Sequence, residues 1–173
     1  MKKPDVSIII LNYNAENFLR ETLKSVQKQK GLVIETIVVD NNSLDNSKAM
    51  VKTEFRGVKW VQRDTSLGFS AGNNAGLPYI HADTVLFLNP DASFTKSSDL
   101  KLCYDKLWSD DTIGALTPRV NLVLTGGIDE TCHRGFPTSF SAFTHFSGLS
   151  KLFPNFPLFN HYTKRYLGYT KEH

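Results

Sequence analysis

The first two-thirds of this 173-residue chain alternates short apolar runs with segments of helical periodicity. The apolar runs occupy residues 6–11, 34–39, 58–62 and 85–88. Between the first three runs, apolar residues recur every three or four positions, as they do on the buried face of a helix. Residues 68–80 are glycine-rich and poorly amphipathic, and are predicted to be a loop that opens into a helix. This alternation is typical of strand-helix-strand units. It predicts an α/β fold, with a Rossmann-like, mostly parallel sheet flanked by helices.

The helical segments and one further strand can be placed from their apolar residues. The stripe of the first helix consists of Phe18, Leu19, Thr22, Leu23 and Val26. Asn14 precedes this stripe and is a residue type that caps helices. The stripe of the second helix consists of Leu44, Ser47, Val51 and Phe55, and that of a later helix of Leu100, Cys103, Tyr104 and Leu107. Residues 113–116 are apolar enough to predict another strand.

Composition excludes several classes of protein. A formal net charge of +3 is too small to indicate a nucleic-acid-binding surface, so no nucleic-acid partner is expected. Cys103 and Cys132 have no metal-ligand spacing and are too sparse for a disulfide framework, which favours a reducing cytoplasm. The run at residues 6–11 is too short for a membrane span and has no cleavage site after it. Any membrane contact is therefore expected to be peripheral, and the oligomeric state is left open.

The last third of the chain differs in character. Residues 119–173 contain seven of the twelve phenylalanines, with three prolines among them and no sustained periodicity. We therefore divide the chain into an α/β domain, residues 1–120, and an aromatic-rich irregular segment, residues 121–173. Short helices are expected near 143–152 and 159–167. Such aromatic content is unusual for a disordered segment, so this segment is expected to pack against something that the chain lacks.

Polar residues follow each of the four predicted strands. The polar segments are Asn12–Asn14, Asp40–Ser43, Ser66–Asn74 and Asn89–Asp91. The carboxyl ends of parallel strands meet at one edge of a sheet, where open α/β folds bind their ligands. The polar segments are therefore expected to converge there. Their shared position is stronger support for a site than any single segment.

Two of these residues suit a nucleobase. Tyr13 offers a flat aromatic face with a hydroxyl at its rim, and Asp40 can accept a hydrogen bond from the imide nitrogen of a pyrimidine. The neighbouring residues Leu11, Asn12 and Asn42 are included in the predicted nucleotide-binding site.

The other segments suit a diphosphate. Gly68 and Gly72, with Gly76 beyond them, allow close backbone approach, and Asn73 and Asn74 add side-chain amides. Asn89 lies at the end of the fourth strand and is added to the predicted nucleotide site. Asp91 is a carboxylate at the mouth of a buried strand, which favours a hard divalent cation, Mg²⁺ or Mn²⁺, completed by phosphate oxygens and water.

Each residue also has a simpler structural explanation. Tyr13 could be an ordinary strand-end aromatic, and Asp40–Ser43 could form only a turn and a cap. The glycines could serve only to pack a short helix tightly, and Asp91 could be a turn residue. A dinucleotide-binding domain would need glycines after the first strand, and an NTPase would need a glycine-lysine-serine or glycine-lysine-threonine loop; neither occurs.

The four segments together resemble family 2 glycosyltransferases, which are inverting enzymes with the A-type glycosyltransferase fold. The matching stretches are Val6–Asn14, Thr36–Ser43, Leu67–Gly76 and Phe87–Asp91. They most resemble the branch that contains rhamnosyltransferases and other surface-polysaccharide enzymes. The resemblance covers residues 5–120. It implies that residues 1–120 bind the nucleotide sugar and that residues 121–173 are the start of the acceptor-side region, so the chain is expected to be the donor-binding half without its C-terminal acceptor part.

The resemblance implies a role for each matching residue. Tyr13 and Asp40 would hold the base of a nucleotide-sugar donor, Asn73 or Asn74 would help to place its diphosphate, and Asp91 would bind the metal. Two positions depart from the family pattern. Asn89 stands where the family often has a first aspartate, so Asp91 alone must hold the ion with help from phosphates. Ser66 stands where an asparagine is common.

The general base that inverting transfer requires is not found. Asp129 and Glu130 lie too early and in unsuitable surroundings, and His133 and Arg134 are interpreted as surface residues. The base is expected beyond His173, so the catalytic residue is unknown. The predicted function is metal-dependent transfer of a sugar from a donor such as dTDP-rhamnose or a UDP-sugar to a glycan or lipid-linked acceptor. A nucleotide-binding module without turnover is the alternative, whereas a nucleotidyltransferase would need a glycine-rich basic loop that is absent.

Overall fold

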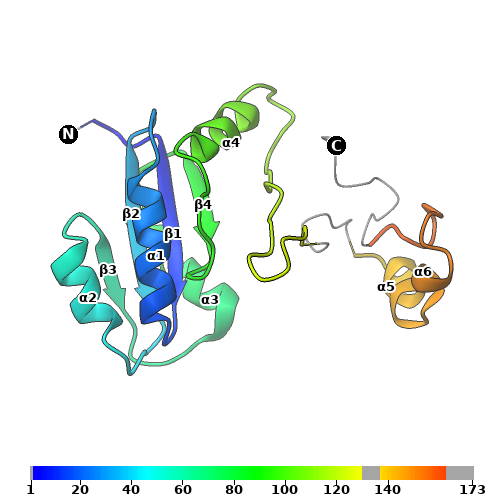
Figure 1. Cartoon of the computed structure of the whole chain (residues 1–173), viewed down its shortest axis with the longest axis horizontal. Helices are drawn as coiled ribbons and strands as arrows, with labels where there is room; N and C mark the ends of the chain where they lie inside the picture. Colours follow the sequence, from blue (N-terminus) through cyan, green and yellow to red (C-terminus); the bar gives the residue numbers. More distant parts are fainter. Residues whose placement is uncertain (1, 130–136, 163–173) are drawn as a thin grey trace. The chain divides into compact units, whose positions relative to one another are not determined.

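The computed structural model describes residues 2–129 and 137–162. They belong to two compact units, residues 1–111 and residues 112–173 (Figure 1). Each unit is described by itself. The assignment of residues 1–120 to nucleotide-sugar binding and of residues 121–173 to the acceptor side stays a prediction.

The first unit contains a four-stranded sheet in the order β3-β2-β1-β4. The strands are β1 (Val6–Asn12), β2 (Ile34–Asp40), β3 (Lys59–Gln62) and β4 (Thr84–Leu88). All three pairings are parallel, so the four carboxyl ends lie at one edge of the sheet (Figure 1). The predicted α/β class and parallel sheet are confirmed.

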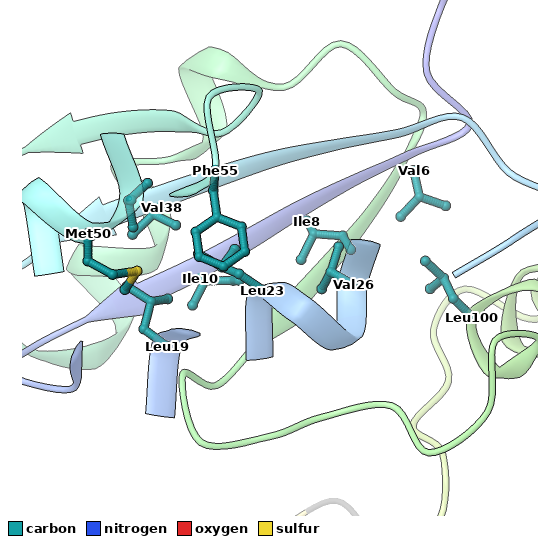
Figure 2. Close-up of a cluster of buried hydrophobic side chains, with 11 residues drawn as sticks. Val6, Ile8, Ile10, Leu19, Leu23, Val26, Val38, Met50, Phe55 and Leu100 are labelled. Carbon is teal, nitrogen blue, oxygen red and sulfur yellow. The ribbon is translucent and has the colours of Figure 1, made fainter. Parts of the chain in front are cut away.

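Helices cover both faces of this sheet. They are α1 (Glu16–Gln27), α2 (Ser47–Glu54), α3 (Gly68–Asn74), the short 3₁₀ helix η1 (Leu77–Tyr79) and α4 (Asp99–Leu107). Because side chains of a strand alternate between faces, Ile8 and Ile10 join the cluster under α1, α2 and α4 that Figure 2 shows. Ile9 points to the opposite face, where it packs with Ile37 and Val39.

Two glycines allow the α3–η1 segment to lie directly on the second face. A Cβ atom added at Gly72 would lie 2.6 Å from Leu11 Cδ1, and one added at Gly76 would lie 2.9 Å from Ile9 Cγ2. Neither glycine has a positive φ. Close packing against strand β1 is therefore what requires glycine at both positions, in agreement with the simpler structural explanation.

Several local predictions are wrong. Asn14 does not cap α1, whose N-cap is Ala15; it adopts a φ of 49° and its Oδ1 instead accepts a hydrogen bond from Leu44 N at 2.7 Å. Phe18 and Leu44 are exposed. Residues 113–116 form no strand. No described strand pairs with them, so their backbone N–H and C=O groups have no ladder of hydrogen bonds to join.

The second unit contains two short helices, α5 (Ser139–Phe146) and α6 (Leu149–Leu152). They are separated by Gly148, which adopts a left-handed conformation with φ of 83°. These helices confirm the expectation near 143–152. Of the helix expected at 159–167, residues 159–162 are not helical and the rest lie outside the described residues. Within the described ranges, no helix is both long and apolar enough to cross a membrane.

Candidate functional site

Three neighbouring strands end in a row of polar side chains. The parallel register places Asn12 of β1 beside Asp40 of β2, and Asp40 beside Gln62 of β3. Asn12 and Asp40 are almost fully buried, whereas Gln62 is exposed. The sequence predicted that the strand ends converge, and for these three residues the register brings them into contact.

The carboxylate of Asp40 is the centre of this row. Its Oδ1 accepts hydrogen bonds from Asn12 Nδ2 at 2.9 Å and from Ser43 Oγ at 2.6 Å. Its Oδ2 accepts from Ser43 N at 3.1 Å and from Gln62 Nε2 at 2.8 Å. A carboxylate has about four acceptor positions, so these donors satisfy it, which explains why the charge can be buried. An incoming imide would have to displace one of the donors.

Ser43 and Asn14 fasten the loops after β1 and β2 to each other. Ser43 Oγ accepts from Asn12 Nδ2 at 3.1 Å and from Asn14 N at 2.9 Å. The next residue in the turn, Asn42, has a φ of 68° and is exposed. Ser43 was part of a recognised segment but not of the predicted site, because its partners lie about 30 residues away and only the register of β1 with β2 brings them together.

Asp45 links the two helices that follow these loops. Its carboxylate accepts hydrogen bonds from Glu16 N at 2.9 Å and from Ser47 N at 3.1 Å, and so joins the first turns of α1 and α2. Burial raises the pKa of Asp45, but the hydrogen bonds from Ser47 and from backbone N–H groups outweigh it and hold the pKa below its ordinary value. The charged form of Asp45 therefore stabilises the fold.

Asn41 attaches the glycine-rich loop to the end of β2. It is buried, its Nδ2 donates to Ser66 Oγ at 2.9 Å, and its Oδ1 accepts from Leu67 N at 3.1 Å. Ser66, noted as a departure from the family pattern, is therefore used in positioning this loop. Apart from the two polar residue types, nothing in the sequence indicates this pairing.

The glycine-rich segment presents some of its predicted residues and buries others. Gly68 begins α3 with a φ of 72° and is exposed. Asn73 is buried, and its Nδ2 donates to Phe69 O at 3.0 Å within the helix. Asn74 is exposed. Of the two asparagines predicted to meet a diphosphate, Asn74 is the one that a ligand can reach.

The segment Asn89–Asp91 forms a tight turn after β4. Ala92 N donates to Asn89 O at 3.2 Å, and Thr22 Oγ1 on α1 lies 2.7 Å from Pro90 O and 2.9 Å from Ala92 O. Asn89 and Asp91 are exposed. The sequence placed Thr22 on a buried stripe but did not indicate that its hydroxyl anchors this turn, because the turn lies 68 residues further along the chain.

A cavity of about 420 Å³ adjoins the end of β3 and contains a residue that the sequence did not single out. Arg63 lines it together with Gln62 and Tyr79, and Arg63 N donates to Asp40 O at 3.0 Å. Arg63 Nε is buried without a hydrogen-bond partner. A guanidinium with an unused donor is suited to an anionic ligand.

The predicted site residues are therefore only partly joined by contacts. Asn12 and Asp40 hydrogen-bond to each other, and Leu11 packs against Gly72. Tyr13 is exposed, as a base-stacking residue would have to be. No hydrogen bond described for residues 2–129 joins Asp91 to the Asp40 network; the two share only the same edge of the sheet.

The donor set of Asp91 fits a metal that is bound together with a ligand. Within residues 2–129 and 137–162, no three His, Cys, Asp or Glu side chains are grouped so that they could hold an ion by themselves. Asp91 supplies one exposed carboxylate. Mg²⁺ commonly uses one or two carboxylates and takes its other ligands from water and phosphate, so a single Asp91 is consistent with an ion that binds with a diphosphate.

Comparison with known proteins identifies the family. Residues 7–159 match the family described as glycosyl transferase family 2. The chain belongs to this family. The resemblance to family 2 glycosyltransferases inferred from the four segments is thereby confirmed.

Two relatives illustrate the match. The chain is 30% identical over 92 residues to a GalNAc(5)-diNAcBac-PP-undecaprenol beta-1,3-glucosyltransferase of Campylobacter jejuni, covering 51% of this chain and 30% of the relative. It is 33% identical over 88 residues to a UDP-Glc:alpha-D-GlcNAc-diphosphoundecaprenol beta-1,3-glucosyltransferase of Escherichia coli, covering 50% of this chain and 34% of the relative. The chain thus spans about a third of their length.

Solved structures show the same fold. A fragment of TarS from S. aureus superposes with a TM-score of 0.62 at 24% identity, over 79% of this chain and 39% of the fragment. The mannosyltransferase PcManGT from Pyrobaculum calidifontis, solved with GDP-Man and Mn²⁺, gives 0.63 at 23% identity, over 70% of this chain and 37% of its own. At these identities the likeness establishes the Rossmann-like fold of the family.

Proposed function

We propose that this family 2 glycosyltransferase chain binds a nucleotide-diphosphate sugar at the carboxyl edge of its sheet, as the donor of a glycosyl transfer. The observation that carries the proposal is the buried carboxylate of Asp40, which is hydrogen-bonded to buried Asn12 and exposed Gln62 at a ligand-binding edge. A purely structural turn would not require a buried charge with three side-chain partners. The fold of the family and the solved nucleotide-sugar complexes support it.

In this proposal Tyr13 stacks on the base and Asp40 accepts its imide N–H. Because Asp40 is already satisfied, the imide must replace a protein donor. Gln62 Nε2 is the one that can leave, since Gln62 is exposed, whereas Asn12 is buried. Leu11 and Asn42 complete the surroundings of the base. The exchange of one hydrogen bond for another makes base binding selective for a ring with an imide, such as uracil or thymine.

The diphosphate is proposed to lie between the glycine-rich segment and the turn at Asp91. Gly68 leaves room for it, and Asn74 offers an exposed amide. Asp91 would hold Mg²⁺ or Mn²⁺ together with the phosphates, and Asn89 would lie beside the nucleotide. When bound, the ion would neutralise negative charge on the diphosphate leaving group.

The complete protein is proposed to transfer the sugar with inversion to a glycan or lipid-linked acceptor. The two glucosyltransferases named above carry undecaprenol-linked acceptors in their names, which supports an acceptor of that class. The donor remains a choice between dTDP-rhamnose and a UDP-sugar. A peripheral location at the inner face of the cell membrane fits such an acceptor.

Titration calorimetry with UDP and dTDP, with and without Mn²⁺, tests donor binding. We expect binding that requires the ion and that Asp91→Asn weakens at least about tenfold. Asp83→Asn is the matched control, because Asp83 precedes the same strand at the opposite edge and only pairs with exposed Lys3. No binding of either nucleotide under any condition would contradict the proposal.

The exchange at Asp40 has its own test. Removing the competing amide in Gln62→Ala leaves Asp40 Oδ2 open to the imide, so pyrimidine nucleotides should bind as tightly as to the wild type or up to about tenfold more tightly. An N3-methylated uridine diphosphate should lose this gain. Weaker binding to Gln62→Ala would show that Gln62 itself contacts the ligand and that Asp40 does not.

The alternative function is nucleotide binding without turnover by this chain. It is favoured by one observation: residues 131–171 contain no Asp or Glu that could act as a general base. An assay of sugar transfer and donor hydrolysis separates the two functions. Transfer by the 173-residue chain would reject the binding-only alternative.

A further inference from the structure

The two units of the chain differ in charge. Residues 1–111 contain 14 Lys or Arg and 14 Asp or Glu, so they are formally neutral, and the net charge of +3 belongs to residues 112–173. Within the latter, residues 131–171 contain five Lys or Arg and no acidic residue. A stretch of this length with one sign of charge is suited to an anionic partner.

The second unit also has an inverted pattern of burial. Its buried residues are the polar Ser141, Thr144, Ser150 and Asn160. Among the described residues of this unit, no hydrophobic side chain is buried. The hydroxyls are satisfied within the helix, since Thr144 Oγ1 donates to Ser141 O at 3.1 Å and Ser141 takes part in a capping box with Thr138. The helices therefore do not enclose an apolar core.

The described part of this unit exposes many large aromatic and aliphatic side chains. They form the aromatic surface, which we define as Phe140, Phe143, Phe146, Leu152, Phe153 and Phe156. Phe140, Phe143 and Phe146 recur every third residue along α5, so they lie along one side of that helix. Lys151 is exposed next to Leu152 and adds a positive charge.

We propose that the aromatic surface docks on the face of an anionic lipid bilayer. Phenylalanine and leucine side chains gain by leaving water for the boundary between headgroups and acyl chains, and basic residues are attracted to anionic headgroups. Residues 131–171 contain no carboxylate side chain, so the anionic headgroups do not repel this stretch. Since none of the described helices can span a membrane, the contact lies in the plane of the interface.

A bilayer explains the charge pattern better than a protein partner does. The core of a protein interface is depleted of charged residues, whereas residues 131–171 carry five Lys or Arg and no acidic residue, a pattern that anionic headgroups attract. The inference does not depend on donor binding, because its residues belong to the second unit alone.

Co-sedimentation with vesicles tests the proposal. The 173-residue chain should bind vesicles of phosphatidylcholine with phosphatidylglycerol at least about tenfold more than vesicles of phosphatidylcholine alone, and salt should weaken the binding. The double variant Phe143→Ser with Phe146→Ser should lower partitioning at least about tenfold. Lys151→Glu should lower it a few-fold on anionic vesicles only.

Phe18→Ser is the matched control. Phe18 is 64% exposed on α1 and Phe143 is 61% exposed on α5, so the two lose similar apolar area. The control should bind vesicles as the wild type does. Urea unfolding monitored in each variant verifies that the exposed substitutions leave the fold intact.

Three outcomes would overturn the proposal. The wild type could remain in solution with anionic vesicles, or the control could lose as much binding as the double variant. The double variant could instead change the mass of the particle in light scattering without affecting vesicle binding, which would assign the aromatic surface to contacts between copies of the chain.

Discussion

Helices α1 and α5 are both amphipathic, but α1 buries its apolar face whereas α5 buries its polar face. α1 packs Leu19, Leu23 and Val26 against the sheet and leaves charged residues exposed. α5 buries Ser141 and Thr144 and exposes Phe143 and Phe146. Helix α1 packs against the sheet. In the described part of the second unit, no buried hydrophobic side chain packs against α5.

This difference shows which unit is stabilised by its own core and which unit exposes apolar side chains to a partner. The first unit gains its stability from its own apolar contacts, so its polar edge is free for a ligand. The second unit leaves its apolar side chains exposed. Large exposed apolar patches mark sites of interaction. Substitutions of the same kind should therefore have different effects in the two units.

The largest contrast is expected for core truncation. Ile8→Ala removes a fully buried side chain under α1 and should lower the free energy of unfolding by about 2–5 kcal/mol. Phe143→Ala should change it by less than about 0.5 kcal/mol, although it removes a larger side chain. Urea unfolding followed by fluorescence measures both. A large loss in Phe143→Ala would show that the second unit has a core of its own.

A pair of glycines gives the next contrast. Gly76→Ala places a methyl group against the buried, stiff side chain of Ile9 and should cost about 1–3 kcal/mol. Gly114→Ala, in the second unit, meets no atom within 4 Å and should be nearly neutral. Equal midpoints in urea for these two variants would mean that η1 does not rest on β1 as described.

Two threonines sharpen the comparison further. Thr22→Val removes the hydroxyl that anchors the Asn89–Asp91 turn to α1 and should cost about 1 kcal/mol. It should also weaken Mn²⁺-dependent nucleotide binding several-fold. Thr144→Val breaks only a contact within one helix and should cost a few tenths of a kcal/mol. Calorimetry showing unchanged nucleotide affinity in Thr22→Val would separate the turn from the site.

The smallest effect concerns pH. The pKa of Asp45 is lower in the folded protein than its unfolded value near 4, so its contribution to stability is complete above that value and is lost as pH falls through the folded pKa. The urea midpoint should therefore fall in this acid range, and less steeply in Asp45→Asn. An identical pH dependence in the variant would contradict this role.

The fold was largely predictable because its strands are buried on both faces and so appear as continuous apolar runs. Register and distant contacts were not predictable. Nothing local indicates that Gln62 would lie beside Asp40 or that Thr22 would hold the turn at Pro90. The strand predicted at residues 113–116 failed because apolar composition does not supply a partner strand.

The candidate site was predictable at the level of its segments but not of individual side chains. The sequence could not distinguish exposed Asn74 from buried Asn73, since the difference arises from how α3 rests on Leu11. Arg63 was missed because an isolated arginine has no sequence signal. The residues around Arg63 come together only when β3 pairs with β2.

If Asp40 binds a pyrimidine nucleotide as proposed, the register that joins Asn12, Asp40 and Gln62 also makes nucleotide retention a test of correct folding. A one-residue slip of β2 would turn Asp40 to the opposite face and break all its side-chain contacts. Such a misfolded molecule would keep much of its secondary structure. Capture on an immobilised pyrimidine nucleotide would then select only the correctly registered molecules from a preparation.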